Sequence, residues 1–339
     1  MEYTKPYRTY EEQAEILIDQ RGMVADRASL IEHLQDAGYY RLSGYWHIFK
    51  RPDDTFREGT AFAKVWDLYT FDRQLRLVVF DAIERVEVYF RTQLAYELAR
   101  TTGPFGFNDR NNLPNLGEER YERFIRKCKE AFNRSREPFA IHFKDKYGDA
   151  HELPPYWMLV NLMDFGMTLT LYKGASNGIR KRIAQGVGVA PAVLDSWLVC
   201  LNTVRNMSAH HGRLWNRRIG TQPSFPRAKN DERWHKPHRV RPDRIFGTLT
   251  VLSYLLEIIA PDTKWRERLF KLLETRSEEE LRMMGFTGNW KSCPFWKPWL
   301  PEVSNSDGGS DEAERARCWL SASRWHRRCR GKGQLYNAN

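Results

Sequence analysis

The residues best suited to chemistry lie between 204 and 217, where the chain reads VRNMSAHHGRLWNR. Cleavage of RNA without a metal needs a group that removes the proton of the 2′-hydroxyl or protonates the leaving oxygen, and a cation that stabilises the phosphorane. His210 and Arg205 are suited to these two roles. Asn206 could fix the imidazole or hold a phosphate oxygen, because residues four apart share a face of a helix. The segment therefore predicts a catalytic site of Arg205, Asn206 and His210.

The spacing of Arg205 and His210 is a weak signal by itself. With nine histidines in an Arg-rich chain, about one such pair is expected by chance, and Arg233 and His238 repeat it. Pro237 interrupts the second pair, which argues against a helical catalytic element there. A structural role also remains open for the first pair, in which Arg205 binds a core carboxylate and His210 caps a helix.

Geometry places a constraint on this site. Residues 205 and 210 stand about 140° apart on an ideal helix, at about 100° per residue. One straight helix cannot easily present both side chains to one substrate. Either the helix is distorted after Ser208, or a second copy of the chain completes the site.

The elements that must position these residues are helical. The longest pattern, over 62–99, repeats apolar residues at helical spacing without proline or glycine, and few segments alternate with period two. We therefore predict an all-α protein. The predicted helices span 10–35 (two short helices that break at Arg21 and Gly22), 62–99, 118–136, 154–172, 181–185, 191–208, 244–259, 264–274 and 277–284. We expect an N-terminal helical and aromatic region at 1–58, the main helical domain at 59–301, and a disordered tail at 302–339, where periodicity is lost.

Charge and composition narrow the class of protein. The formal net charge is +11, which favours a polyanionic partner such as nucleic acid or an acidic membrane surface. Five cysteines without a CxxC pair indicate neither a disulfide framework nor a zinc site. Apolar stretches fall short of the run of about 20 residues that spans a membrane, and no signal peptide is evident. We expect a cytoplasmic protein that needs no membrane, metal or other cofactor.

Several further residues could support the site. Glu84, Glu87 and Arg91 form a polar stripe on the longest helix, either as a surface salt-bridge ladder or as partners that orient Arg205 or His210. His211, which follows the motif, is a further supporting candidate. The candidates for binding RNA are basic or aromatic side chains, namely Arg213, Arg217, Arg41 and Tyr39. The stretch from Tyr39 to Trp46 could stack bases or form a hydrophobic joint.

An ordered series of segments resembles the Abi family of abortive-infection proteins of the AbiD and AbiF kind. It covers about residues 4–299 and leaves out the tail from Glu302. Its segments are 5–7 (KPY) with 10–13 (YEEQ), 39–45 (YYRLSGY), 72–73 (DR), 82–87 (AIERVE) with Arg91, 153–158 (LPPYWM), 205–217 (the HEPN signature), 284–286 (MGF), 289–291 (NWK) and Trp296.

The resemblance implies a HEPN-type helical bundle with metal-independent endoribonuclease activity, in which Arg205, Asn206 and His210 are catalytic. It also implies a composite site in a homodimer, a toxin role in phage defence, and a structured non-coding RNA as regulator. Two alternatives remain. One is a non-catalytic RNA-binding protein that holds a structured non-coding RNA, and the weaker one is a DNA-binding regulator, for which no clear helix-turn-helix is visible.

Overall fold

The computed structural model describes residues 2, 4 and 6–296. The chain forms two compact units, 1–300 and 301–339, and the described residues all belong to the first. Within them the regular structure is helical, accompanied by two isolated β-bridges, Val24 with Ala61 and Lys50 with Phe56. The prediction of an all-α protein is thus confirmed. The predicted tail at 302–339 lies outside the described residues.

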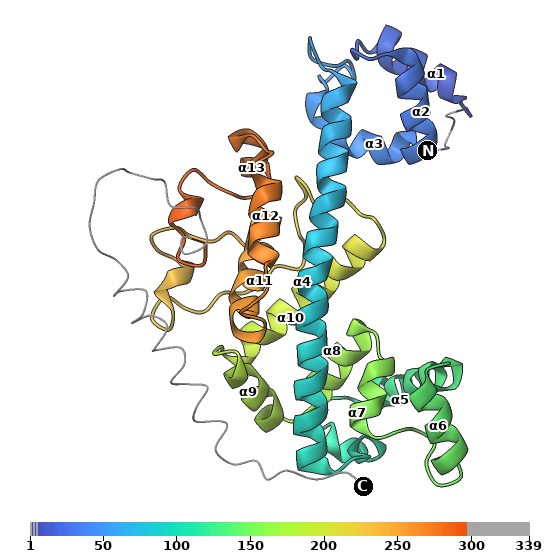
Figure 1. Ribbon diagram of the computed structural model, residues 1–339, viewed down its shortest axis with the longest axis vertical. Coiled ribbons are helices and arrows are strands. Elements are labelled where there is room, and N and C mark those ends of the chain that lie inside the picture. The colour runs from blue at the N-terminus through green and yellow to red at the C-terminus, as the bar shows by residue number, and fades with distance from the viewer. Residues whose placement is uncertain (1, 3, 5, 297–339) are drawn as a thin grey trace. The chain divides into compact units, whose positions relative to one another are not determined.

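The central element is α4 (Phe62–Thr102), a helix of 41 residues. At 1.5 Å per residue it is about 60 Å long, and Figure 1 shows it running through the unit, with shorter helices along its whole length. Its apolar repeat buries Leu68, Leu75, Val79 and Val86 completely. The uninterrupted periodicity of the sequence explains this helix, and Gly103, with φ of 79°, ends it.

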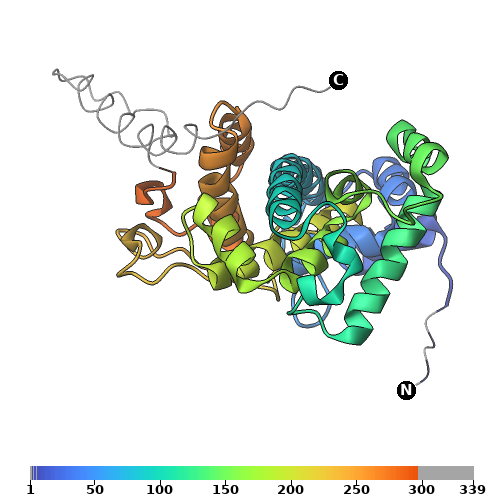
Figure 2. The same cartoon turned by 90° about the horizontal axis from the view of Figure 1, so that it is seen from below.

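The other helices gather in groups around α4. At its N-terminal end lie α1 (Tyr10–Glu15), which continues as a π-helix (Ile16–Gln20), α2 (Arg27–Ala37) and α3 (Tyr39–Trp46) (Figure 1). Near its C-terminal end lie α5 (Glu118–Arg134), α6 (Pro138–Tyr147), α7 (Tyr156–Leu159) and α8 (Phe165–Gly174). Along the other side are α9 (Asn177–Gly186), α10 (Pro191–Ala209), α11 (Ile245–Ile259), α12 (Trp265–Leu273) and α13 (Glu278–Met283). Seen nearly end-on in Figure 2, α4 lies between these last two groups.

The structure differs from the predicted helices in three places. The helix expected over 154–172 is broken into α7, a 3-10 turn (Val160–Leu162) and α8. The break occurs because Asp164 starts a new helix: its side chain accepts a hydrogen bond from the backbone N–H of Met167 at 2.7 Å. The second is α3, because residues 39–46 were expected only as an aromatic stretch. The third is α6, which no predicted helix covers. It begins with Pro138 at its first position, where the missing N–H costs nothing.

A buried carboxylate joins three parts of the chain. Asp72 of α4 is fully buried and accepts hydrogen bonds from the hydroxyl of Tyr45 in α3 (2.6 Å) and from Arg76 in the next turn of α4. Its other oxygen accepts from the backbone N–H groups of Leu214 (3.0 Å) and Trp215 (2.6 Å). Asp72 therefore fixes the loop after α10 to both α3 and α4.

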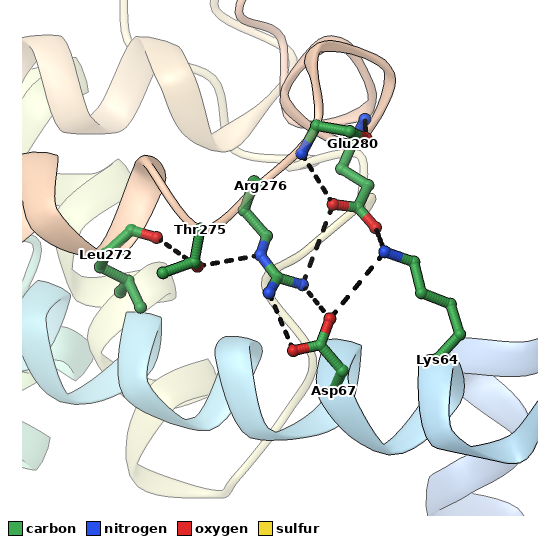
Figure 3. A network of polar contacts seen from close by, with 7 residues as sticks. Lys64, Asp67, Leu272, Thr275, Arg276 and Glu280 are labelled. Atoms are coloured by element: carbon green, nitrogen blue, oxygen red, sulfur yellow. Dashed lines mark hydrogen bonds and ion pairs between the residues drawn. The ribbon is translucent and has the colours of Figure 1, made fainter.

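A second network holds the last helices against the beginning of α4 (Figure 3). The guanidinium of Arg276 makes two hydrogen bonds to the carboxylate of Asp67, at 2.7 and 2.9 Å, and its side chain is only 6% exposed. It also stacks on the ring of Phe71 at 4.8 Å. Glu280 of α13 approaches Arg276 at 3.9 Å and pairs with Lys64. These hydrogen bonds lower the pKa of Asp67, as expected for a carboxylate held by a guanidinium.

Over the described part of the chain, no single helix is both long enough and apolar enough to cross a membrane. Only α9 and α10 taken together meet that criterion, and they are bent by 77° relative to each other.

The Asp72 network predicts a large loss of stability in Asp72→Ala. This change leaves a buried guanidinium and two buried N–H groups without their acceptor, so we expect urea unfolding to show a loss of about 3–5 kcal/mol. Asp81→Ala is the matched control on the same helix. Asp81 pairs with Arg85 and Arg268 at the surface, and we expect a loss below about 1 kcal/mol. Equal losses in the two variants would contradict the central role of Asp72.

Candidate active site

The candidate site begins at the C-terminal end of α10. This helix starts at Pro191, buries Leu194, Leu201 and Val204, and ends at Ala209. The N–H of His211 donates to the carbonyl of Ser208 (3.1 Å) and that of Gly212 to the carbonyl of Met207 (2.7 Å). With His211 at φ of 58°, this pattern is a Schellman motif.

The end of α10 removes the constraint that an ideal helix would place on Arg205 and His210, whose side chains would point about 140° apart. His210 is the capping residue, with φ of −89° and ψ of 17°, so it no longer follows the helical path. Of the two alternatives left by the sequence, a distortion after Ser208 is the one observed. The side chain of His210 is exposed, and no described residue forms a hydrogen bond with its ring.

Arg205 lies between an acidic and an aromatic side chain of α4. Its Nε is 3.8 Å from Oε2 of Glu87, and its guanidinium carbon lies 5.7 Å from the centre of the Phe80 ring. Its Nη1 approaches Oδ1 of Asn206 at 3.5 Å. The distance to Glu87 is too long for a hydrogen bond, and the buried Nε has no hydrogen-bond partner among the described residues. Arg205 is therefore held beside Glu87 and Phe80, while its Nη2 forms no hydrogen bond with a described residue and its side chain is 29% exposed.

Glu87 is the acid that holds this arginine. It is 7% exposed and pairs with Arg91 one turn later, which also donates to the carbonyl of Met163 at 2.5 Å. Burial raises the pKa of Glu87, and the nearby charges of Arg91 and Arg205 oppose this rise. A carboxylate between two guanidinium groups fixes both. The sequence left open a structural role for Arg205, in which it binds a core carboxylate. The structure shows this ion pair, with Glu87 as the carboxylate.

Arg205, Asn206 and His210 line one pocket of about 670 Å³. The pocket lies among α5, α8 and α10, and its basic side chains outnumber its acidic ones. The basic residues are Arg120, Arg123, Lys127, Lys173 and Arg205, and the acidic one is Asp164. The remaining lining residues are Leu116, Phe124, Phe165, Gly166, Met167, Thr170 and Asn202. Such a cavity concentrates anions near His210.

The loop that follows His210 is held by α3. Arg41 donates to the carbonyl of His211 at 2.8 Å, and the half-buried Arg213 donates to the carbonyl of Gly44. Burial lowers the pKa of Arg213. The next two residues, Leu214 and Trp215, donate their backbone N–H groups to Asp72, which also accepts from α3 through Tyr45. Helix α3 therefore holds the loop that follows His210 in place.

The other predicted residues lie outside the pocket lining. Tyr39 accepts a hydrogen bond from Arg21 at 2.6 Å and packs edge-on against Trp46, with ring centres 5.0 Å apart. Glu84, His211 and Arg217 are exposed. Their predicted roles, like the RNA contacts predicted for Arg41 and Arg213, stay predictions.

The sequence did not identify the basic residues of α5 and α8. Arg120, Arg123 and Lys127 are spaced by three and four residues, so they share a face of α5. That spacing is a usable signal for a basic face, but it does not reveal which helix the face opposes. Within residues 6–296 no three His, Cys, Asp or Glu side chains cluster as metal ligands would.

Comparison with known proteins identifies a family. A family model described as Abi-like protein matches residues 32–216, more than half of the chain, from α2 to the end of the motif. The segments resembling that family at 5–13 and 284–296 lie outside this match. No curated protein and no solved structure matches the chain. From the extent of the family match, the chain belongs to the Abi-like proteins, a family associated with abortive infection as a defence against phage.

Proposed function

We propose that this protein is a metal-independent endoribonuclease of the HEPN type, with Arg205, Asn206 and His210 as its catalytic residues. One observation carries the proposal: all three side chains line a single pocket in which basic residues predominate. His210 is exposed and the side chain of Arg205 is 29% exposed, so both can reach a substrate phosphate.

The proposed reaction is an internal transesterification. His210 removes the proton of a ribose 2′-hydroxyl or protonates the leaving 5′-oxygen. The 2′-oxygen forms a bond to phosphorus, the bond from phosphorus to the 5′-oxygen breaks, and the products carry a 2′,3′-cyclic phosphate and a 5′-hydroxyl. Arg205 stabilises the negative charge that builds up on the phosphorane oxygens. Asn206, beside Arg205 at 3.5 Å, binds one of these oxygens or the imidazole.

Glu87 acts in this proposal as a positioning residue. It is buried beneath Arg205 and is itself held by Arg91, which Met163 anchors through its carbonyl oxygen. This chain of contacts sets the direction of the guanidinium without occupying the pocket. A charged group that is fixed before the substrate binds stabilises a transition state more effectively than a mobile one.

We further propose that the active species is a homodimer joined through α4. An exposed stripe of this helix carries Arg73, Leu77, Phe80, Glu84 and Val88, three to four residues apart. Two such stripes in antiparallel twofold contact bring Leu77 of each copy to Phe80 of the other, and Arg73 to Glu84. This pairing joins apolar to apolar and basic to acidic side chains, as a self-complementary twofold interface requires. Because Arg205 stacks on Phe80, the interface adjoins the pocket.

In the cell, we propose that this activity makes the protein a toxin of phage defence, and that a structured non-coding RNA restrains it through the basic surface. The second candidate function, a non-catalytic protein that holds such an RNA, uses the same basic pocket. The two functions differ in whether RNA is cut.

We expect the purified protein to cut single-stranded RNA in the presence of EDTA. His210→Ala and Arg205→Ala should each lower the rate by about 10²- to 10⁴-fold, because each removes a group that acts only in the reaction. His142→Ala and Arg126→Ala, at exposed positions of α6 and α5 outside the pocket, are matched controls and should cut at the rate of the unaltered protein.

Circular dichroism must show the same helical content in all four variants. Cleavage at the unaltered rate by either pocket variant would refute the site. Binding of RNA without any cleavage by the unaltered protein would support the non-catalytic alternative instead.

The positioning role of Glu87 predicts that Glu87→Gln lowers cleavage on the order of 10- to 100-fold, since Arg205 loses its anchoring charge. Single-turnover cleavage should slow while RNA binding changes little. Asp81→Asn, a surface carboxylate on the same helix that pairs with Arg85 and Arg268, should have no effect. A loss of RNA binding that equals the loss of cleavage in Glu87→Gln would refute a role in positioning alone.

The proposed interface predicts that a chain carrying both Leu77→Glu and Val88→Glu sediments as a monomer and cuts RNA more slowly. Ile141→Glu, at an exposed apolar residue of α6, should leave sedimentation unchanged. An unaltered protein that is both monomeric and fully active would exclude the dimer.

Mixing His210→Ala with Arg205→Ala chains tests whether one site takes residues from two chains. Because both residues line one chain's pocket, we expect no recovery of activity.

A further inference from the structure

The basic face of α5 has no role in the catalytic proposal. Arg120, Arg123 and Lys127 are exposed, and their side chains line the same pocket as Arg205 and His210. Arg123 pairs with Glu119 on its own helix. No described residue forms an ion pair with Arg120 or Lys127, so both charges are available to a ligand. Together with Lys173 of α8, the three basic residues of α5 form one wall of the pocket. This wall comes from a part of the chain that is distant in sequence from residues 204–217.

The position of this wall is fixed by close packing. Asn115, just before α5, donates its backbone N–H to the carbonyl of Gly174 (3.2 Å) and its side-chain amide to that of Ala175 (2.7 Å). A Cβ at Gly174 would lie 3.3 Å from the Cβ of Leu116, so glycine permits this approach. The end of α8 and the start of α5 are therefore locked together, and α8 in turn packs on α10.

Other polar groups also line this pocket. The first turn of α8, which contains Phe165 and Gly166, lines the pocket, and the first N–H groups of a helix have no partner within it. Asn202 lies one turn before Asn206, and its Oδ1 is buried without a hydrogen-bond partner among the described residues. Asp164 supplies the opposing charge, but its Oδ1 is already occupied by the N–H of Met167.

We infer that the pocket binds a single strand of RNA through two neighbouring phosphates. The scissile phosphate lies at Arg205 and His210, and Arg120 and Lys127 bind an adjacent one, with Arg123 and Lys173 beside them. The identification of the ligand as RNA rests on the proposed function. A pocket of about 670 Å³ is of the size that holds a small ligand, so we expect it to take a short piece of one strand in preference to a duplex.

The test compares two double variants that remove the same charge from the same helix. Arg120→Ala with Lys127→Ala changes the pocket. Arg126→Ala with Lys129→Ala is the control: neither residue lines the pocket, and Lys129 forms a surface ion pair with Glu152, which contributes little to stability. Both doubles are made in the His210→Ala chain, so that the RNA is not consumed. Binding of a short fluorescent single-stranded RNA is measured by anisotropy at several salt concentrations.

We expect the pocket double to bind about tenfold more weakly than its parent at about 0.2 M salt. The slope of log Kd against log salt concentration should fall by about 0.7, because Arg120 and Lys127 together neutralise one phosphate, and each phosphate neutralised in a single strand contributes about 0.7. The control double should keep the affinity and the slope of the parent. The conservative double Arg120→Lys with Lys127→Arg retains the charge and should restore both.

Equal changes in the pocket and control doubles would overturn the inference, since they would indicate only general attraction to a basic surface. So would an unchanged slope in the pocket double. A duplex of the same sequence that shows the same dependence on Arg120 and Lys127 would overturn the preference for a single strand. Failure of the unaltered protein to cut RNA is a separate result: it refutes the catalytic proposal and leaves the binding result standing.

Discussion

The buried carboxylate of Asp72 accepts hydrogen bonds from α3, from α4 and from two backbone N–H groups just after the motif. The loop from His211 to Trp215 has no regular structure of its own, so these bonds and those from Arg41 and to Gly44 determine its path. That path begins where α10 ends in a left-handed residue, His211. The place of His210 beside Arg205 in the pocket therefore depends on a carboxylate that is distant from both in sequence. Such dependence fits a catalytic group that must be held rigidly on a loop.

Charge in the candidate site is arranged in two layers. Below the surface, Glu87 between Arg91 and Arg205 balances part of the positive charge of the arginines and orients them. At the surface, the basic side chains of α5 and α8 line one pocket with Arg205 and His210, and Asp164 is the single acid among them. The lower layer fixes the direction of Arg205, and the upper layer gives the pocket the positive charge that the proposed RNA ligand requires. Each layer draws on helices that are separated by other elements in the chain, so only the complete bundle builds the site.

The sequence predicted the helices with the clearest periodicity, and α4 and α10 are the best examples. It also offered the contact between Glu87 and Arg205 as one of two possibilities, and the structure places them 3.8 Å apart. The break before Asp164 was missed because the apolar pattern continues through it, although Asp ahead of an apolar run is a helix-start signal. The basic face of α5 was missed for another reason. Periodicity shows that residues share a face, but the partner of that face is set by tertiary packing, here by Asn115 and Gly174.

The central claim is that His210 and Arg205 promote attack by a ribose 2′-hydroxyl. The most direct measurement is mass spectrometry of the products formed from one oligonucleotide in EDTA, compared with the same sequence built entirely of 2′-deoxy sugars. We predict fragments with 2′,3′-cyclic phosphate and 5′-hydroxyl ends from the RNA, and an intact deoxy strand. Fragments with 5′-phosphate ends, or cleavage of the deoxy strand, would contradict the mechanism.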